Sequence, residues 1–248
     1  ARPLTERSRL FRFIESLWLL AALAEEEGIA LLEVNPIGLD ADGRPRPLDA
    51  VGRRAPPPPA RLAPPSDFLT ALTQPRSVAV AGVSANPDGL GRIILEKLRR
   101  CPALAGKVSV IKPGQTEYLG LPCLPDVAAL RAAPVDLLLL ALPAPAAAGV
   151  MTELLAQEGG AQVVALVAGG LGDGADAEGW GASVGAQLHA ARTAGRWTPA
   201  VLGPNFLGHW VPERGIDTTF IPPDRLAIRN EAGGNVALLA QSGAFMLS

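Results

Sequence analysis

Residues 77–91, SVAVAGVSANPDGLG, join a short apolar run to a loop of small residues and then to two glycines that open a helical segment. A strand, a glycine-rich loop and a helix in this order form the first unit of a doubly wound nucleotide-binding sheet, where free backbone amides face an anion. The spacing of Gly82, Gly89 and Gly91 is not the strict G-x-G-x-x-G form, so the loop alone is a weak indication. The segments that follow it strengthen the prediction.

Apolar runs alternate with helical segments after this loop. The clearest run, VDLLLLAL at 135–142, is apolar at almost every position, as a strand buried on both faces requires. The alternation predicts an α/β fold with a Rossmann-like, doubly wound parallel sheet. The predicted strands are 77–82, 107–111, 135–141, 162–167, 200–203 and 234–241, and the predicted helices lie near 89–100, 125–131, 145–158 and 176–193.

The first 50 residues have a different pattern and form a separate unit. Apolar residues recur at helical spacing from Leu10 to Ala24, and Gly28 is placed to end that helix. Two short strands joined by a turn at Asp42-Gly43 follow. Residues 52–66, GRRAPPPPARLAPPS, predict an extended linker, because proline removes backbone donors and fixes φ.

Composition excludes several classes of protein. The chain carries 22 basic and 24 acidic residues, a net charge of −2, so it lacks the basic footprint of a nucleic-acid binder. No uncharged apolar stretch is long enough to span a membrane, and the first residues lack a secretory signal, which together predict a cytoplasmic protein. Cys101 and Cys123 are interpreted as small buried hydrophobes. A homo-oligomer is compatible with the strongly apolar pattern.

The end of the second predicted strand bears on the ligand. A sheet that reads the ribose of NAD carries an acidic residue there, about 20 residues beyond the loop. The stretch KVSVIKPG at 107–114 places Lys112 at that point instead. A cation favours a phosphorylated ribose, which NADP and coenzyme A both possess, although an ordinary surface lysine would fit the same position.

Six stretches occur together in a recognisable order: EVNPIGLDADGRPRPLDA (33–50), SVAVAGVSANPDGLGRIILEKL (77–98), GLPCLPDVAAL (120–130), VDLLLLALPAPAAAGVMTELL (135–155), VLGPNFLG (201–208) and GNVALLAQSGA (234–244). The first resembles the end of an ATP-grasp module. The other five resemble the CoA-binding and ligase parts of NDP-forming acyl-CoA synthetases, the superfamily of succinyl-CoA ligase. Each stretch alone is unremarkable, whereas six in register are fairly specific.

The resemblance implies four segments. Residues 1–51 would be the C-terminal segment of an ATP-grasp module, 52–73 a proline-rich linker, 74–204 the Rossmann-like CoA-binding domain, and 205–248 the N-terminal segment of a flavodoxin-like, succinyl-CoA ligase-like domain. In the family, a histidine downstream of the Ser-Gly helix carries the phosphoryl group, and the front of the ATP-grasp module grips the nucleotide. Neither of these two segments is found in this sequence. We therefore expect this chain to be an internal part of a longer synthetase and to be inactive alone.

The resemblance also assigns residues in the ATP-grasp segment. It places Asn35 and Asp49 as two ligands of Mg²⁺, a cation that takes one or two protein oxygens and leaves the rest to phosphates and water. Glu33 would point toward the site where phosphate passes between nucleotide and enzyme. Without the resemblance, Asn35 and Asp49 would be interpreted as turn residues.

The CoA site implied by the resemblance runs along the loops that follow the predicted strands. The first loop would surround the CoA phosphates, Lys112 would lie near the 3′-phosphate, the PAPAAAG turn would line the adenine or pantetheine path, and the VAGGLGDG turn would let the thioester end approach. The residues concerned are Gly82, Ser84, Asn86, Gly89, Gly91, Lys112, Pro143, Ala144 and Gly169. The first loop is longer than that of succinyl-CoA ligases, so contacts before Gly91 are the least defined.

The last segment carries the remaining assignments. Asn205 would lie near the reacting acyl group, and Ser242-Gly243 would begin a helix whose N-terminus binds the phosphoryl group. Ser-Gly at a strand end is also a common helix cap. Of the two histidines, His189 is expected on the solvent side of a helix and His209 in a loop, with phosphate transfer by His209 the less favoured of its two roles.

The predicted function is that of an acid-thiol ligase fragment. The whole synthetase would join a carboxylic acid to CoA, with ATP and Mg²⁺ as cofactors, through acyl-phosphate and phosphohistidine intermediates, and this fragment would mainly bind CoA. Its partners would be the acid, CoA and the remaining segments of the synthetase. Two alternatives stay open: a non-catalytic CoA-binding regulatory module and an NADP-dependent oxidoreductase, the latter without an evident catalytic arrangement.

Overall fold

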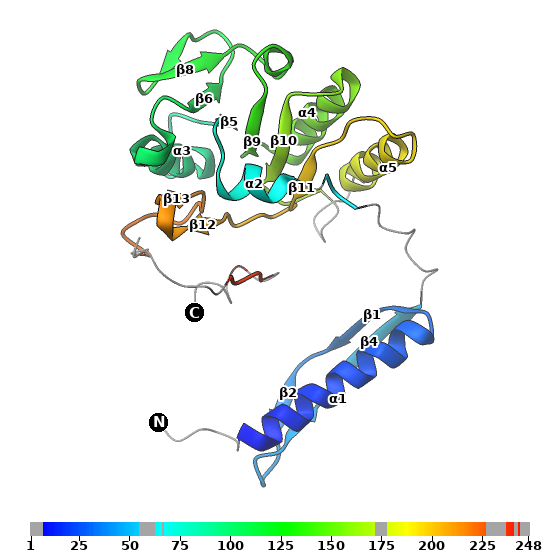
Figure 1. Ribbon diagram of the computed structural model, residues 1–248. Coiled ribbons are helices and arrows are strands. Elements are labelled where there is room, and N and C mark those ends of the chain that lie inside the picture. Colours follow the sequence, from blue (N-terminus) through cyan, green and yellow to red (C-terminus); the bar gives the residue numbers. More distant parts are fainter. Residues whose placement is uncertain are drawn as a thin grey trace. The chain divides into compact units, whose positions relative to one another are not determined.

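A computed structural model describes residues 7–54, 63–65, 67–171, 178–226, 237–240 and 243. The chain divides into two compact units, Ala1–Arg61 and Leu62–Ser248 (Figure 1). The first is a helix with short antiparallel strands, and the second is built on a larger, mostly parallel sheet. None of the helices in the described ranges combines the length and the apolarity needed to cross a membrane.

The first unit contains helix α1 (Arg7–Glu26) and strands β1 (Ile29–Val34), β2 (Ile37–Leu39), β3 (Pro45–Pro47) and β4 (Ala50–Arg54). Gly28, with φ +69°, ends the helix as predicted. The predicted hairpin is present, but each arm is divided into two strands, so that β1 pairs with β4 and β2 with β3. Among the side chains described here, Ala24 is the one buried hydrophobic residue, and Trp18 and Leu19 are exposed.

The second unit is organised by a seven-stranded sheet of order β11-β10-β9-β5-β6-β8-β7 (Figure 1). All neighbouring pairs are parallel except β7 with β8. The first parallel strand, β5, lies inside the sheet, with β6 on one side and β9 on the other, so the strand order reverses beside it. The strands are β5 (Val78–Ala81), β6 (Val108–Ile111), β7 (Glu117–Tyr118), β8 (Leu121–Leu124), β9 (Val135–Leu140), β10 (Ala161–Leu166) and β11 (Ala200–Leu202).

Both faces of this sheet are covered, as the near-continuous apolar runs predicted. Helices α2 (Phe68–Thr73) and α3 (Leu90–Arg100) pack on one face, where Val78 and Val80 lie. Helices α4 (Ala144–Gln157) and α5 (Trp180–Thr193) pack on the other, where Ala79 and Ala81 lie. Every residue of β5 and β9 is buried. The doubly wound α/β prediction for this region is therefore confirmed.

The structure also differs from the sequence prediction in several strands and helices of the second unit. The helix expected near 125–131 is a 3₁₀ turn, η2 (Ala128–Arg131), in which the Ala129 amide donates to Asp126 Oδ1 at 3.0 Å. Strands β7 and β8 were missed because they are short and interrupted by proline and glycine. Of the strand predicted at 234–241, residues 237–240 form no strand, and the other positions lie outside the described residues.

A short hairpin after the sheet is fastened to helix α3. It contains β12 (Trp210–Val211), η3 (Pro212–Arg214) and β13 (Ile216–Asp217), and a further turn, η1 (Pro102–Leu104), follows α3. The Lys97 ammonium lies 2.8 Å from Asp217 Oδ2 and donates to Thr219 Oγ1 at 2.8 Å. These largely buried contacts connect the segment after β11 to the main sheet.

The loop that leaves β5 is held against the backbone after β9. Gly82 has φ +85°, and a Cβ atom there would lie 2.2 Å from the carbonyl oxygen of Ala141. A Cβ on Gly91 would lie 2.6 Å from the Gly82 carbonyl oxygen. Neither position has room for a side chain, so the turn brings the start of α3 directly onto the strand ends.

We predict that Gly82→Ala destabilises the second unit far more than Gly106→Ala. Gly106 also has positive φ, +70°, but a Cβ there would meet nothing within 4 Å. The control should lose about 1–2 kcal/mol from the left-handed conformation alone, and Gly82→Ala roughly 2 kcal/mol more from the backbone clash. Urea unfolding followed by circular dichroism measures both, and equal losses would contradict the close approach.

Candidate functional site

The loop between β5 and α3 presents unpaired backbone donors. The amides of Ser84, Ala85 and Asn86 donate no hydrogen bond to any atom of the described residues, and all three residues are exposed. The Asn86 side chain accepts from the Asp88 amide at 3.1 Å, and Gly89 is the N-cap of α3 without a side-chain cap. Consecutive free amides beside a helix N-terminus are donors from which an anion can accept hydrogen bonds.

The carbonyl groups of the same loop are held by side chains from the neighbouring strands. The Lys112 ammonium, directly after β6, donates to the Val83 carbonyl at 3.1 Å. The Tyr118 hydroxyl, in β7, donates to the Ser84 carbonyl at 3.0 Å. Carbonyl oxygens are the negative ends of the peptide dipoles and would repel an anion. In this loop, two carbonyl oxygens instead accept hydrogen bonds from Lys112 and Tyr118.

Two cations share the Tyr118 ring. The Lys112 ammonium lies 4.8 Å from the ring centroid and the Arg92 guanidinium carbon 5.7 Å. Arg92 also donates to the Tyr118 hydroxyl at 2.9 Å and to Glu96 at 3.0 Å. The sequence indicated Lys112 but neither Arg92 nor Tyr118, since a single tyrosine in a two-residue strand carries no recognisable pattern. The loop is therefore bordered by two positive charges.

The other predicted CoA contacts follow β9, β10 and β11. Pro143 is the N-cap of α4 and Ala144 its first residue. A Cβ on Gly170, next to Gly169, would lie 3.1 Å from the Ala144 Cβ. The Asn205 amide donates to the Ala168 carbonyl at 3.2 Å. Since these strands are parallel to β5, the structure brings these residues to the same carboxyl edge as the first loop.

The rest of the predicted phosphoryl site is only partly described. Ser242 lies outside the described residues. A Cβ on Gly243 would lie 3.0 Å from Leu207 Cδ2, which places Gly243 beside the segment that follows Asn205. The helix expected to begin at Ser242-Gly243 therefore stays a prediction.

The predicted magnesium ligands are neighbours in the first unit. The Asn35 amide donates to the Asp49 carbonyl at 3.1 Å, and Asp49 Oδ1 accepts from the Ala50 amide at 2.8 Å. Glu33 pairs with Val51 in the adjoining ladder, with its side chain exposed. Within the described ranges, no group of three or more His, Cys, Asp or Glu side chains is arranged for a metal ion. The two residues are therefore adjacent through their backbones, and magnesium binding by their side chains stays a prediction.

His209 has a structural role. Its Nδ1 lies 2.9 Å from Thr218 Oγ1, and its buried Nε2 completes no hydrogen bond within the described part of the chain. Burial lowers the pKa of His209 from 6.5 to about 4, against the raising effects of the Leu72 backbone and Asp217. A neutral ring with both nitrogens enclosed is a poor acceptor of phosphate. His189, on α5, is exposed as predicted.

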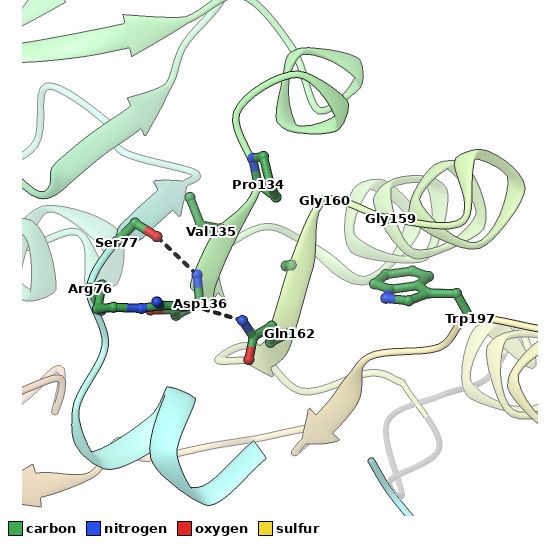
Figure 2. A pocket seen from close by; sticks show the side chains of 10 residues that line it. Arg76, Ser77, Pro134, Val135, Asp136, Gly159, Gly160, Gln162 and Trp197 are labelled. Carbon is green, nitrogen blue, oxygen red and sulfur yellow. Dashed lines mark hydrogen bonds and ion pairs between the residues drawn. The ribbon is translucent and has the colours of Figure 1, made fainter. Parts of the chain in front are cut away.

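A pocket of about 440 Å³ lies at the opposite, amino edge of the sheet (Figure 2). Asp136 accepts from the Arg76 amide at 2.6 Å and from Gln162 at 2.9 Å, and it forms an ion pair with the Arg76 guanidinium. Trp197 forms another part of the lining. The charged groups are paired with each other and lie away from the loops described above, so this pocket is not the anion site.

The comparison with known protein families identifies the second unit. The pattern of the CoA binding domain family matches residues 76–208, more than half of the chain. The chain therefore belongs to the CoA binding domain family. The matched residues contain the loop after β5, Lys112 and the turns after β9 and β10.

Individual relatives place the chain more narrowly. Acetate–CoA ligase (ADP-forming) I of Archaeoglobus fulgidus is 31% identical over 179 residues, covering 71% of this chain and 23% of that protein. The alpha subunit of acetate–CoA ligase (ADP-forming) I of Pyrococcus furiosus is 32% identical over 186 residues, covering 71% and 36%. The superfamily predicted from the six stretches, that of NDP-forming acyl-CoA synthetases and succinyl-CoA ligase, is confirmed.

A solved structure agrees with this placement. Acetyl-coenzyme A synthetase 1 of Candidatus Korarchaeum cryptofilum, in complex with phosphate and ADP, is 26% identical with a TM-score of 0.52. The match covers 72% of this chain and 35% of that one. This chain thus spans between about a quarter and just over a third of the relatives and structure described here.

We predict that acid destabilises the second unit through His209. Because its pKa falls from 6.5 to about 4 on folding, the unfolded chain binds a proton between these values that the folded chain does not. Stability is therefore complete above pH 6.5 and declines as the pH falls toward 4, by roughly 2 kcal/mol between pH 7.5 and pH 5. Urea midpoints at the two pH values measure this loss.

The variant His209→Asn is the control for this pH dependence. It keeps a polar group toward Thr218 but cannot titrate, so its midpoint should change less with pH than that of the wild type. The same change in both proteins would show that His209 is not the responsible group.

Proposed function

We propose that this chain is the CoA-binding portion of an NDP-forming acyl-CoA synthetase. The observation that carries the proposal is the loop after β5, whose free amides at residues 84–86 lie beside a helix N-terminus and two cations. CoA carries a diphosphate and a 3′-phosphate, which match this arrangement of amides and charges. The close packing of Gly82 on Ala141 and of Gly91 on Gly82 fixes where this loop lies at the ends of the strands.

Each edge residue has a proposed part in holding CoA. Gly82, Ser84, Asn86, Gly89 and Gly91 would surround the diphosphate through backbone groups. Lys112 would lie near the 3′-phosphate, since its ammonium group has three donors and the Val83 carbonyl accepts from only one of them. Pro143 and Ala144 would line the adenine or pantetheine path, and Gly169 would let the thiol end approach the acyl group near Asn205.

The whole synthetase would join a carboxylic acid to CoA with ATP, giving acyl-CoA, ADP and phosphate. A histidine of the synthetase would first take the γ-phosphoryl group of ATP, releasing ADP, and would pass it to the carboxylate, giving an acyl phosphate. The CoA thiol would then attack the acyl carbon, forming the thioester and releasing phosphate. Ser242 and Gly243 would bind the phosphoryl group at the start of a helix. Two relatives are ADP-forming acetate–CoA ligases, which supports this reaction.

The first unit would contribute to the nucleotide half of the reaction. Asn35 and Asp49 would hold Mg²⁺, which neutralises phosphate charge when bound, and Glu33 would face the passing phosphoryl group. The adjacency of the Asn35 and Asp49 backbones supports this pairing. The segments would then be 1–51 from an ATP-grasp module, 52–73 as linker, 74–204 for CoA and 205–248 from the ligase domain. The proposed linker range begins with the last residues of β4 and ends with helix α2, which packs on the main sheet.

Calorimetry with CoA and dephospho-CoA tests this proposal. We predict that the wild-type chain binds CoA more tightly than dephospho-CoA. The variant Lys112→Met should lower the ratio of the two affinities about tenfold, because it loses a hydrogen bond from a charged donor to the 3′-phosphate. The matched control is Lys107→Met. Lys107 precedes the other end of β6, is exposed and donates to the Ala103 carbonyl at 2.9 Å, so its loss should leave the preference unchanged.

Two outcomes would contradict the proposal. Binding of neither CoA nor dephospho-CoA by the folded wild type would remove the assigned ligand. A preference for NADPH over CoA would favour the oxidoreductase alternative. Tight CoA binding alone is shared with a regulatory module, and acyl-CoA formation by the full-length synthetase separates that module from the enzyme.

A further inference from the structure

Tyr118 lies where three otherwise separate parts of the candidate site meet. Its hydroxyl accepts from Arg92, in the first turn of α3, and donates to the Ser84 carbonyl in the loop after β5. Its ring contacts the Lys112 ammonium at the end of β6. One side chain therefore connects the helix, the loop and the cation.

We propose that Tyr118 is a positioning residue that fixes the loop amides for an anionic ligand and, through its ring, places the Lys112 ammonium. This inference rests on the proposed function for the identity of the ligand, CoA. Tyr118 itself need not touch CoA. Its two parts, the hydroxyl and the ring, act on different portions of the site, so that each can be removed separately.

The hydroxyl acts on the orientation of the loop. A peptide group directs its N–H and C=O in opposite senses, so a carbonyl that is held toward β7 directs the amide of the same peptide away from it. The Ser84 carbonyl belongs to the peptide whose amide is that of Ala85, one of the three free donors. Fixing this peptide before the ligand arrives reduces the conformational entropy lost on binding.

The ring acts on the cation. An ammonium over an aromatic face is attracted by the ring quadrupole and loses rotameric freedom. Lys112 is held by this contact and by the Val83 carbonyl. Without the ring, the four-carbon Lys112 side chain would sample more rotamers, and a phosphate near it would gain less from its charge.

Two variants separate these actions. Tyr118→Phe removes the hydroxyl and keeps the ring, so we expect CoA and dephospho-CoA to bind about fivefold more weakly, with their ratio unchanged. Tyr118→Leu removes both the hydroxyl and the ring, so the ratio of the CoA affinity to the dephospho-CoA affinity should also fall toward one. The control is Thr73→Val, which removes another hydroxyl-to-carbonyl bond, to Leu69 at 2.8 Å in α2, and should change neither affinity nor ratio.

Amide hydrogen exchange gives a measurement that needs no ligand. The informative amides are those of Asp88 and Gly89, which donate to Asn86 within the loop. They should exchange at the same rate in the wild type and Thr73→Val and several times faster in Tyr118→Phe, with unfolding midpoints unchanged. Unchanged loop exchange in Tyr118→Phe overturns the inference, whether or not CoA binds. If the loop loosens as expected but the wild type binds no CoA, the positioning role stands and the assigned ligand is wrong.

Discussion

The structure of the second unit depends on a close backbone approach at the carboxyl ends of β5 and β9. Gly82 turns with φ +85° so near to Ala141 that a Cβ would lie 2.2 Å from its carbonyl oxygen. This contact brings Gly91, and with it the start of α3, directly against the strand ends. The same contact places the free loop amides at the reversal of strand order, where doubly wound sheets bind ligands. Packing at the strand ends therefore requires that Gly82 and Gly91 carry no side chain.

The main sheet could be predicted because its strands are buried on both faces. Runs such as 135–142 are apolar at nearly every position, and a run of this kind leaves few alternatives to a central parallel strand. The edge of the sheet was harder to predict. β7 and β8 are short, contain or adjoin proline and glycine, and owe their pairing to tertiary contacts instead of a repeating pattern. The 3₁₀ turn at η2 was missed for a similar reason, since four residues show no complete helical period.

Part of the candidate site could be predicted from the order of the strands. Gly82, Ser84 and Lys112 follow predicted strands, and parallel topology alone brings them to one edge. Arg92 and Tyr118 gain their place from side-chain contacts that join α3 to β7. These contacts give the loop two distinct surfaces. Its carbonyls are engaged by Lys112 and Tyr118, while its amides are left exposed. An anion at this loop would meet free amides, while the Val83 and Ser84 carbonyls are occupied within the protein.

The central claim is that an anionic carrier binds at the carboxyl edge of the sheet, although the pocket described above lies at the amino edge. A backbone nuclear magnetic resonance titration of the chain with CoA distinguishes the two edges directly. The account predicts that amide resonances of residues 83–91 shift and saturate, while those of Gly160, Ala161 and Gln162 stay in place. Shifts confined to the amino-edge residues, with the loop resonances unchanged, would contradict it.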